Sequence, residues 1–240
     1  MAINYTYFES SGYRVIKTHV SNIVSEVIKK PVCSTNNYGI NGGFFASNLY
    51  TAPPTGGLSI SYDGATQDPG SNAGGTRNRG TFFTYLDNGV TKAGITRCTT
   101  IPNLKQQVGN LQFKTIIGGG SLHLTGTEDQ FKTIHEDEVW NVHAGIAATR
   151  RAGLGFKNES NGVYAYLVTS TVWKTLYNLR DFFKDDLGCN NAVFLDGDGS
   201  VQMQVYANGE LIKADGTDPS PGRYVWNMVY LIVNSYISNK

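Results

Sequence analysis

The segment of residues 190–206, NNAVFLDGDGSVQMQVY, decides how the rest of the chain is interpreted. Its apolar run AVFL (192–195) is typical of a strand that is buried on both faces. The run VQMQVY (201–206) alternates apolar and polar residues, as a half-buried strand does. The sequence therefore predicts two strands that meet at a short polar corner.

The corner DGDGS (196–200) carries two carboxylates and a hydroxyl on glycine-rich backbone, which a ligand can approach closely. An ordinary turn is the alternative, since Asp and Gly are common turn residues. A calcium loop of the EF-hand type is not expected, because the glycine and the glutamate that such a loop needs at its sixth and twelfth positions are missing. We predict no metal site of that type and no cofactor, while a divalent cation near Asp196 and Asp198 stays open.

The composition predicts one strand-rich domain over residues 1–240. A chain of 240 residues with 40% hydrophobic content can bury one sizeable core. The 28 glycines and 14 tyrosines, between short alternating segments, favour an α+β fold with a mixed or antiparallel sheet. The 20 basic and 19 acidic residues nearly cancel, so no nucleic-acid partner is expected. No apolar run is long enough to span a membrane.

The first thirty residues contain nothing like a secretory leader, which favours a cytoplasmic or virion-associated protein over a secreted one. The three cysteines, Cys33, Cys98 and Cys189, are far apart and form no CxxC pair. We predict that they are reduced and structural.

One main helix is predicted at about residues 171–187, packed on the sheet. Its apolar residues recur at helical spacing, Ser170 can cap its start and Gly188 its end. Residues 101–112 fit either a short helix or a loop. The segment 51–80 is too poor in apolar residues for a core of its own and is predicted to be a long loop or lid.

Two further segments carry candidate polar groups. INGGFF (40–45) is a sharp turn anchored by two phenylalanines, and Asn41 can both donate to and accept from a sugar hydroxyl, although a plain hairpin tip fits equally well. Arg150 and Arg151 enter a strand of small apolar residues. A guanidinium there needs a partner, which is either a carboxylate of the protein or an anionic ligand.

Four segments, taken in order, resemble the phosphodiester glycosidase family. They are INGGFF (40–45), IIGGGSLHL (116–124), RAGLG (151–155) and LGCNNAVFLDGDGS (187–200). The match spans about residues 36–206, with the helix in the expected place. One departure stands out, because Asp198 occupies the position of the family's middle glycine.

The resemblance implies a hydrolase that cleaves the bond between a sugar's anomeric carbon and a phosphodiester, in a small-molecule or polymeric phosphate-linked sugar. It implies Asp196, Asp198 and Arg151 as catalytic residues. Arg151 would contact phosphate, Asp196 would stabilise or attack the anomeric carbon, and Asp198 would be a second acid. The implied substrate-binding residues are Asn41, Gly42, Gly43, Gly119, His143, Arg150, Gly197 and Ser200.

Two other interpretations stay open. A non-catalytic module, of viral origin in one version, that sequesters a phosphate-linked sugar or a nucleotide would keep the arginine but tolerate loss of Asp196. A purely structural component of a particle would have no pocket between the glycine corners.

Overall fold

The computed structural model describes residues 4–47, 51–138, 147–215 and 222–232. Strands dominate these residues, which confirms the predicted strand-rich fold, and each strand pair among them is antiparallel. The largest sheet has six strands in the order β1 (Tyr5–Ser10), β2 (Tyr13–His19), β13 (Gly162–Ser170), β12 (Ala152–Glu159), β14 (Asn191–Phe194) and β11 (Gly120–Ser121).

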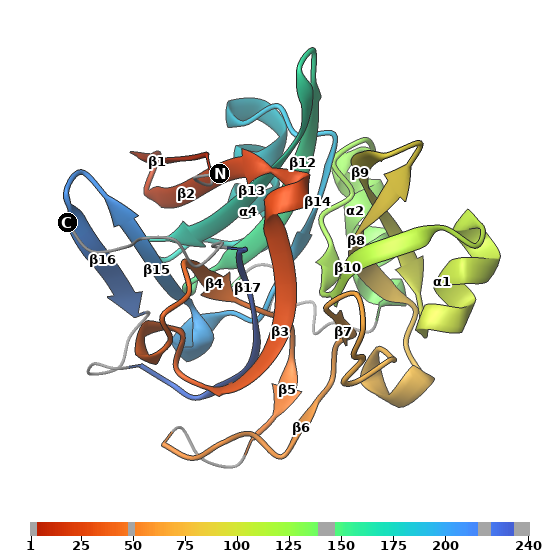
Figure 1. Ribbon diagram of the computed structural model, residues 1–240, viewed down its shortest axis with the longest axis horizontal. Helices are drawn as coiled ribbons and strands as arrows, with labels where there is room; N and C mark the ends of the chain where they lie inside the picture. Colours follow the sequence, from red (N-terminus) through yellow and green to blue (C-terminus); the bar gives the residue numbers. More distant parts are fainter. Residues whose placement is uncertain (1–3, 48–50, 139–146, 216–221, 233–240) are drawn as a thin grey trace.

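Two further sheets complete the body of the fold, and in Figure 1 the four-stranded sheet lies to the right of the other two. The five-stranded sheet has the order β16 (Glu210–Asp215), β15 (Gln202–Ala207), β4 (Gly39–Asn41), β17 (Val225–Leu231) and β3 (Ile23–Lys30). The four-stranded sheet has the order β7 (Ser61–Tyr62), β10 (Gln112–Gly118), β8 (Arg79–Asp87) and β9 (Val90–Cys98), and β5 (Phe45–Ala46) pairs with β6 (Gly56–Gly57).

The six-stranded and five-stranded sheets share one apolar core. Alternate residues of their strands point into it, as the period of two along a strand requires. The buried side chains that meet there include Leu154, Leu167 and Val193 from the larger sheet and Ile40, Met203 and Val229 from the smaller one.

The other face of the six-stranded sheet is covered by a helix, α4 (Leu176–Asp181), which continues as the π-helix η4 (Phe182–Asp186). Phe183 is fully buried between helix and sheet. A Cβ atom on either Gly153 or Gly155 of β12 would lie 2.7 Å from its ring. The glycines of RAGLG therefore allow the helix to approach the sheet closely.

The predicted start of this helix is wrong. Ser170 does not cap a helix but pairs with Tyr13 as the last residue of β13. The helix begins after Thr175, whose hydroxyl accepts from the Asn178 amide in a capping box. Val172, expected on the apolar stripe, is 48% exposed. Pairing with β2 extends the strand further than the local apolar pattern indicates.

The prediction of one main helix holds only in part, because the described residues form two more helices. The helix α1 (Ile101–Val108) is capped by Thr100, which settles the ambiguity of residues 101–112. The helix α2 (Glu128–Asp137) is capped by Thr127 and Gln130 in a second capping box. The short 3-10 turns are η1 (Val20–Asn22), η2 (Val32–Ser34), η3 (Ala73–Gly75) and η5 (Asp198–Ser200).

The segment 51–80 contains parts that belong to the body of the fold. Ile60 and Asn72 are fully buried, and β7 pairs with β10. The Asn72 side chain accepts from the Ile60 amide at 3.1 Å and donates to the Cys98 carbonyl at 2.8 Å. The lid therefore stays a prediction, and only the exposed residues of segment 51–80 could form it.

All three cysteines are buried thiols, which agrees with the structural role predicted for them. Among the helices of the described residues, none combines the length and the apolar character needed to cross a bilayer.

Candidate active site

The two glycine corners singled out in the sequence interlock beyond the end of β14. Asn41 Nδ2 donates to the Asp196 carbonyl at 2.8 Å, and Asn41 Oδ1 accepts from the Gln202 amide at 3.1 Å. The Asp196 amide donates in turn to the Gly42 carbonyl at 3.1 Å. Because Asn41 is fully buried, its amide group fixes the backbone on both sides of the DGDGS corner.

The carboxyl group of Asp196 is half-buried among polar partners. The Gly197 amide donates to its Oδ1 at 3.2 Å, and the Ser200 side chain also hydrogen-bonds to it. Arg223 Nη1 donates to Ser200 Oγ at 3.1 Å, which places a positive charge behind the hydroxyl. Burial nevertheless outweighs these contacts and raises the pKa of Asp196 to about 6. The carboxyl group therefore titrates close to neutral pH, where acid, base and carboxylate catalysis are all accessible.

The carboxylate of Asp198 is exposed at the same corner. Its backbone has φ = 56°, the left-handed conformation that glycine adopts without cost and that Asp tolerates better than most residues. Thr149 Oγ1 donates to Asp198 Oδ1 at 2.8 Å. Asp198 thus adopts a backbone conformation that glycine would adopt more easily, and its carboxylate is held by Thr149.

The guanidinium of Arg151 lies beside the corner and is almost fully buried. Its Nε donates to the Lys174 carbonyl at 3.0 Å and its Nη2 to the Ala147 carbonyl at 2.6 Å. Its Nη1 is 3.9 Å from the position that a Cβ atom on Gly197 would take. Burial lowers the pKa of Arg151 to about 10, partly opposed by the charge of Asp198. The structure therefore brings Asn41, Arg151 and Asp196 to one corner.

The neighbouring Arg150 diverges from Arg151. Its side chain lines a separate cleft, where its Nη1 is 3.5 Å from the Ser170 carbonyl. Only its backbone reaches the corner, since its carbonyl accepts from the Asp198 amide at 2.9 Å. Adjacent residues in extended backbone point to opposite sides, so the two side chains diverge, and a substrate contact from Arg150 stays a prediction.

The predicted binding glycines pack tightly against neighbouring backbone and side chains. A Cβ atom on Gly43 would lie 2.4 Å from the Gly118 carbonyl oxygen, and one on Gly119 would lie 2.3 Å from the Phe194 carbonyl oxygen. Close packing of strands therefore already explains why these positions hold glycine. A substrate contact from them stays a prediction, and His143 lies outside the described residues.

Sequence reasoning missed two polar residues near the corner, Arg223 and Asn227. Asn227 lies in β17 and is 1% exposed, and a Cβ atom on Gly42 would be 2.3 Å from its Oδ1. Within the described part of the chain, neither the Nδ2 nor the Oδ1 atom of Asn227 has a hydrogen-bond partner. A buried amide without partners costs about 1–3 kcal/mol, so such a group is a candidate for ligand binding. The signal in the sequence is a single Asn inside an otherwise apolar strand.

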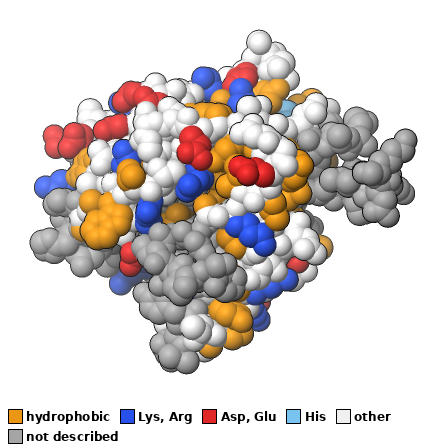
Figure 2. All heavy atoms as spheres, turned by 90° about the vertical axis from the view of Figure 1, so that its left-hand side faces the viewer, with side chains coloured by type: hydrophobic (Ala, Val, Ile, Leu, Met, Phe, Trp, Pro, Cys, Tyr) orange, Lys and Arg blue, Asp and Glu red, His pale blue; other side chains and the backbone are white. Residues whose placement is uncertain are grey.

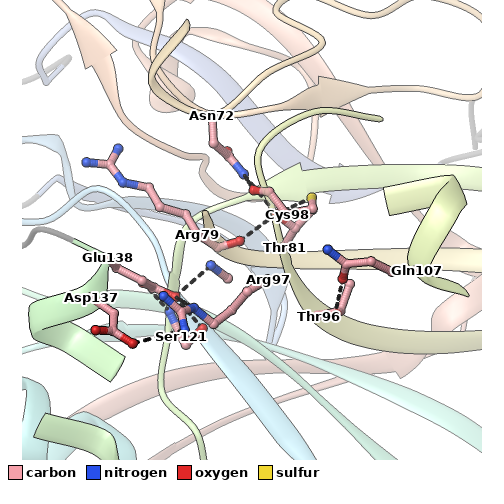
Figure 3. A network of polar contacts seen from close by, with 11 residues as sticks. Asn72, Arg79, Thr81, Thr96, Arg97, Cys98, Gln107, Ser121, Asp137 and Glu138 are labelled. Atoms are coloured by element: carbon pink, nitrogen blue, oxygen red, sulfur yellow. Dashed lines mark hydrogen bonds and ion pairs between the residues drawn. The ribbon is translucent and has the colours of Figure 1, made fainter. Parts of the chain in front are cut away.

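A buried carboxylate, that of Glu138, holds the GGGS segment in place. Its Oε1 accepts from the Gly80 amide at 2.9 Å, and its Oε2 accepts from the Ser121 amide at 3.0 Å. Arg97 Nε lies 3.3 Å from Oε1, and Figure 3 shows Arg97 and Ser121 converging on this carboxylate. Glu138 thus ties the end of α2 to β8, β9 and β11, and we assign it a structural role.

Within the described residues, no group of three His, Cys, Asp or Glu side chains is arranged so that it could hold a metal ion. A cation shared by Asp196 and Asp198 stays a prediction.

The fold and the corner together define a strand-rich domain that gathers two carboxylates and two arginines, Arg151 and Arg223, around interlocked glycine turns. A family model described as phosphodiester glycosidase (NAGPA) matches residues 34–232. The chain belongs to the phosphodiester glycosidase family, which confirms the resemblance of the four sequence segments. Among curated proteins, none matches the chain significantly.

Similar solved structures include one from zebrafish and one from Synechocystis. The catalytic domain of zebrafish N-acetylglucosamine-1-phosphodiester alpha-N-acetylglucosaminidase, auto-inhibited by its pro-peptide, is 18% identical, with a TM-score of 0.61 over 95% of this chain and 81% of that chain. A hypothetical protein from Synechocystis is 14% identical, with a TM-score of 0.48 over 95% of this chain and 61% of that chain. At 18% identity, the likeness to the zebrafish enzyme concerns the fold.

Proposed function

We propose that this protein hydrolyses the glycosidic bond between the anomeric carbon of a sugar and a phosphodiester, as in a sugar-1-phosphodiester or a nucleotide-linked sugar. Membership of the family and the fold shared with the zebrafish enzyme support this activity. The observation that carries the proposal is the half-buried carboxyl group of Asp196, whose pKa is raised to about 6 and whose backbone is fixed by Asn41.

The reaction breaks the bond between the anomeric carbon and the phosphate oxygen and leaves the bond electrons on that oxygen. Water supplies the new oxygen on the anomeric carbon, and its proton is released or passes to the phosphate. The transition state resembles an oxocarbenium ion, so a nearby carboxylate stabilises it. A phosphate leaves readily, which reduces the need for acid assistance. The site must therefore supply a carboxylate to the sugar and donors to the phosphate.

In this scheme Asp196 in its carboxylate form faces the anomeric carbon, and Arg151 contacts the phosphate. The support is that the Arg151 guanidinium and the Asp196 carboxyl flank the same glycine, Gly197. Asp198 is the second acid, exposed and within the same corner. Asn41 acts as a positioning residue, because both ends of its amide bind the backbone of the corner.

Asn227 is assigned to the sugar. Its amide can donate to one hydroxyl group and accept from another, and these bonds would satisfy both of its unpaired atoms. A buried amide also makes the site selective, because a ligand that lacks the matching hydroxyl would leave the amide unpaired and bind more weakly.

The test is incubation of the full chain with a panel of sugar-1-phosphodiesters and nucleotide-linked sugars, with products read by mass spectrometry. We expect release of a free sugar and a phosphate monoester from at least one compound. Asp196→Asn keeps the shape of the side chain and should lower turnover by about 10²–10⁴-fold.

The matched control is Glu136→Gln, which removes an exposed carboxylate on α2. Normal turnover by Asp196→Asn would refute the assignment of that residue. A compound that the wild type binds and returns unaltered would instead identify a binding module, the alternative drawn from the sequence.

A further inference from the structure

A second polar cleft lies between the six-stranded and five-stranded sheets, and the proposed reaction does not use it. Its volume is about 260 Å³, and its walls carry three cationic side chains, those of Arg14, Arg150 and Lys213. The end of β13 and the residue after it complete one wall with three hydroxyl-bearing residues, Thr169, Ser170 and Thr171. Figure 2 views the molecule from the side where β2 and β16 lie and shows Lys and Arg side chains near its centre.

The three cations come from segments far apart in the chain, and the pairing of strands brings them together. Arg14 lies directly opposite Thr169 in the register of β2 and β13. Arg150 precedes β12, and Lys213 lies in β16 of the other sheet. Like charges gathered in one cleft repel one another, which destabilises the fold unless an anion balances them.

The acidic groups of the described residues offset this charge only in part. Arg14 Nε lies 3.3 Å from Glu9, a carboxylate that is 54% exposed and therefore weakly paired. The Lys213 ammonium donates to the Cys33 carbonyl at 2.9 Å and has no carboxylate partner among the residues that the structure describes.

Arg150 is the residue that points most clearly to a ligand. Its Nε is buried and has no hydrogen-bond partner among the described residues, and its Nη1 lies 3.5 Å from the Ser170 carbonyl. The planar guanidinium of an arginine whose Nε is buried and poorly satisfied can pair with an oxyanion such as phosphate through two parallel hydrogen bonds.

We propose that this cleft binds a phosphate-type oxyanion, a phosphate or diphosphate group, held by Arg150 and Lys213 with Arg14 in support. Its volume is below the roughly 300–1,000 Å³ of pockets for drug-sized ligands, which suits a small anion. Val201, which follows the DGDGS corner, lines the cleft, so the anion lies next to the candidate active site but outside it. The same chemistry fits a second phosphate of a phosphate-linked substrate or free inorganic phosphate.

The experiment is calorimetric titration of the full chain with inorganic pyrophosphate at constant ionic strength. We expect saturable binding by the wild type. Arg150→Gln and Lys213→Gln should each weaken it by about tenfold or more, since each removes one charge-assisted contact. Lys132→Gln, which removes an exposed charge on α2, is the matched control and should change affinity less than twofold.

Absence of saturable binding by the wild type, or unchanged affinity in both cleft variants, would overturn the proposal. If Arg150→Gln fails to fold, Lys213→Gln decides alone, because Lys213 is exposed and its loss leaves the core intact. The Asp196→Asn variant should bind pyrophosphate like the wild type, so this result is independent of the proposed hydrolysis. Competition between pyrophosphate and a sugar phosphodiester would assign the cleft to the substrate, and independent binding would assign it to free phosphate.

Discussion

Replacing Asp196 by Asn should stabilise the folded protein at neutral pH while it removes the proposed activity. The carboxylate is half-buried, and burial is the largest influence on its pKa, which is raised from 3.8 to about 6. The folded state therefore disfavours the charged form. Asn keeps the acceptor oxygen for the Gly197 amide but carries no charge to bury.

The direction of the pH dependence follows from proton binding. Between pH 3.8 and about 6 the folded state holds more protons on Asp196 than the unfolded state, so the free energy of unfolding falls as the pH rises through this window. The shift corresponds to about 3 kcal/mol at pH 7 as an upper bound. The partial exposure of Asp196 and the lost attraction to Arg223 make the actual gain smaller than this upper bound. We therefore expect the free energy of unfolding of Asp196→Asn to exceed that of the wild type by about 1–2 kcal/mol.

The assay is urea unfolding of both proteins, followed by intrinsic fluorescence, from pH 4 to pH 8. The difference in the free energy of unfolding should be near zero at pH 4 and reach its full size above about pH 6. Glu136→Gln, the exposed control, should stay within about 0.5 kcal/mol of the wild type throughout. A variant that is less stable than the wild type at pH 7, or a difference that does not change with pH, would refute the account of Asp196.

Three further outcomes are expected. The value of kcat/KM for a sugar phosphodiester should rise with pH through about 6 as the Asp196 carboxylate forms, and a fall over the same range would assign Asp196 the role of a general acid instead. Arg151→Ala should weaken the affinity for a phosphate-bearing sugar by about tenfold or more and leave the affinity for an uncharged glycoside unchanged, and Arg151→Lys should have a smaller effect. Equal losses of affinity for both ligands would indicate that Arg151 has a structural role. Asp198→Gly should change the free energy of unfolding, measured by heat or urea, by less than about 1 kcal/mol, because the backbone of Asp198 already has φ = 56°. A loss of several kcal/mol would show instead that the hydrogen bond from Thr149 to Asp198 holds the corner together.

The sequence alone was sufficient to identify the family and the residues of the DGDGS corner. The order of INGGFF, GGGS, RAGLG and DGDGS marks where glycine is needed, and this pattern is visible in the sequence although the close approaches join distant residues such as Gly43 and Gly118. Alternating apolar residues likewise predict strands from short-range pattern alone. The buried stripe of the helix was identified for the same reason, although pairing with β2 moved its start from Ser170 to Thr175.

Only the tertiary structure decided what the polar side chains contact. Asn41 binds the backbone of a corner 155 positions away, and Asn227 is buried without a partner beside Gly42. Arg150 and Arg151, adjacent in the chain, lie in different surroundings, since Arg150 lines the cleft with Arg14 and Lys213 while Arg151 lies beside Gly197. The physical reason is that burial and charge depend on which strands pair across the sheets, and contacts between residues so far apart leave no periodic signal in the sequence.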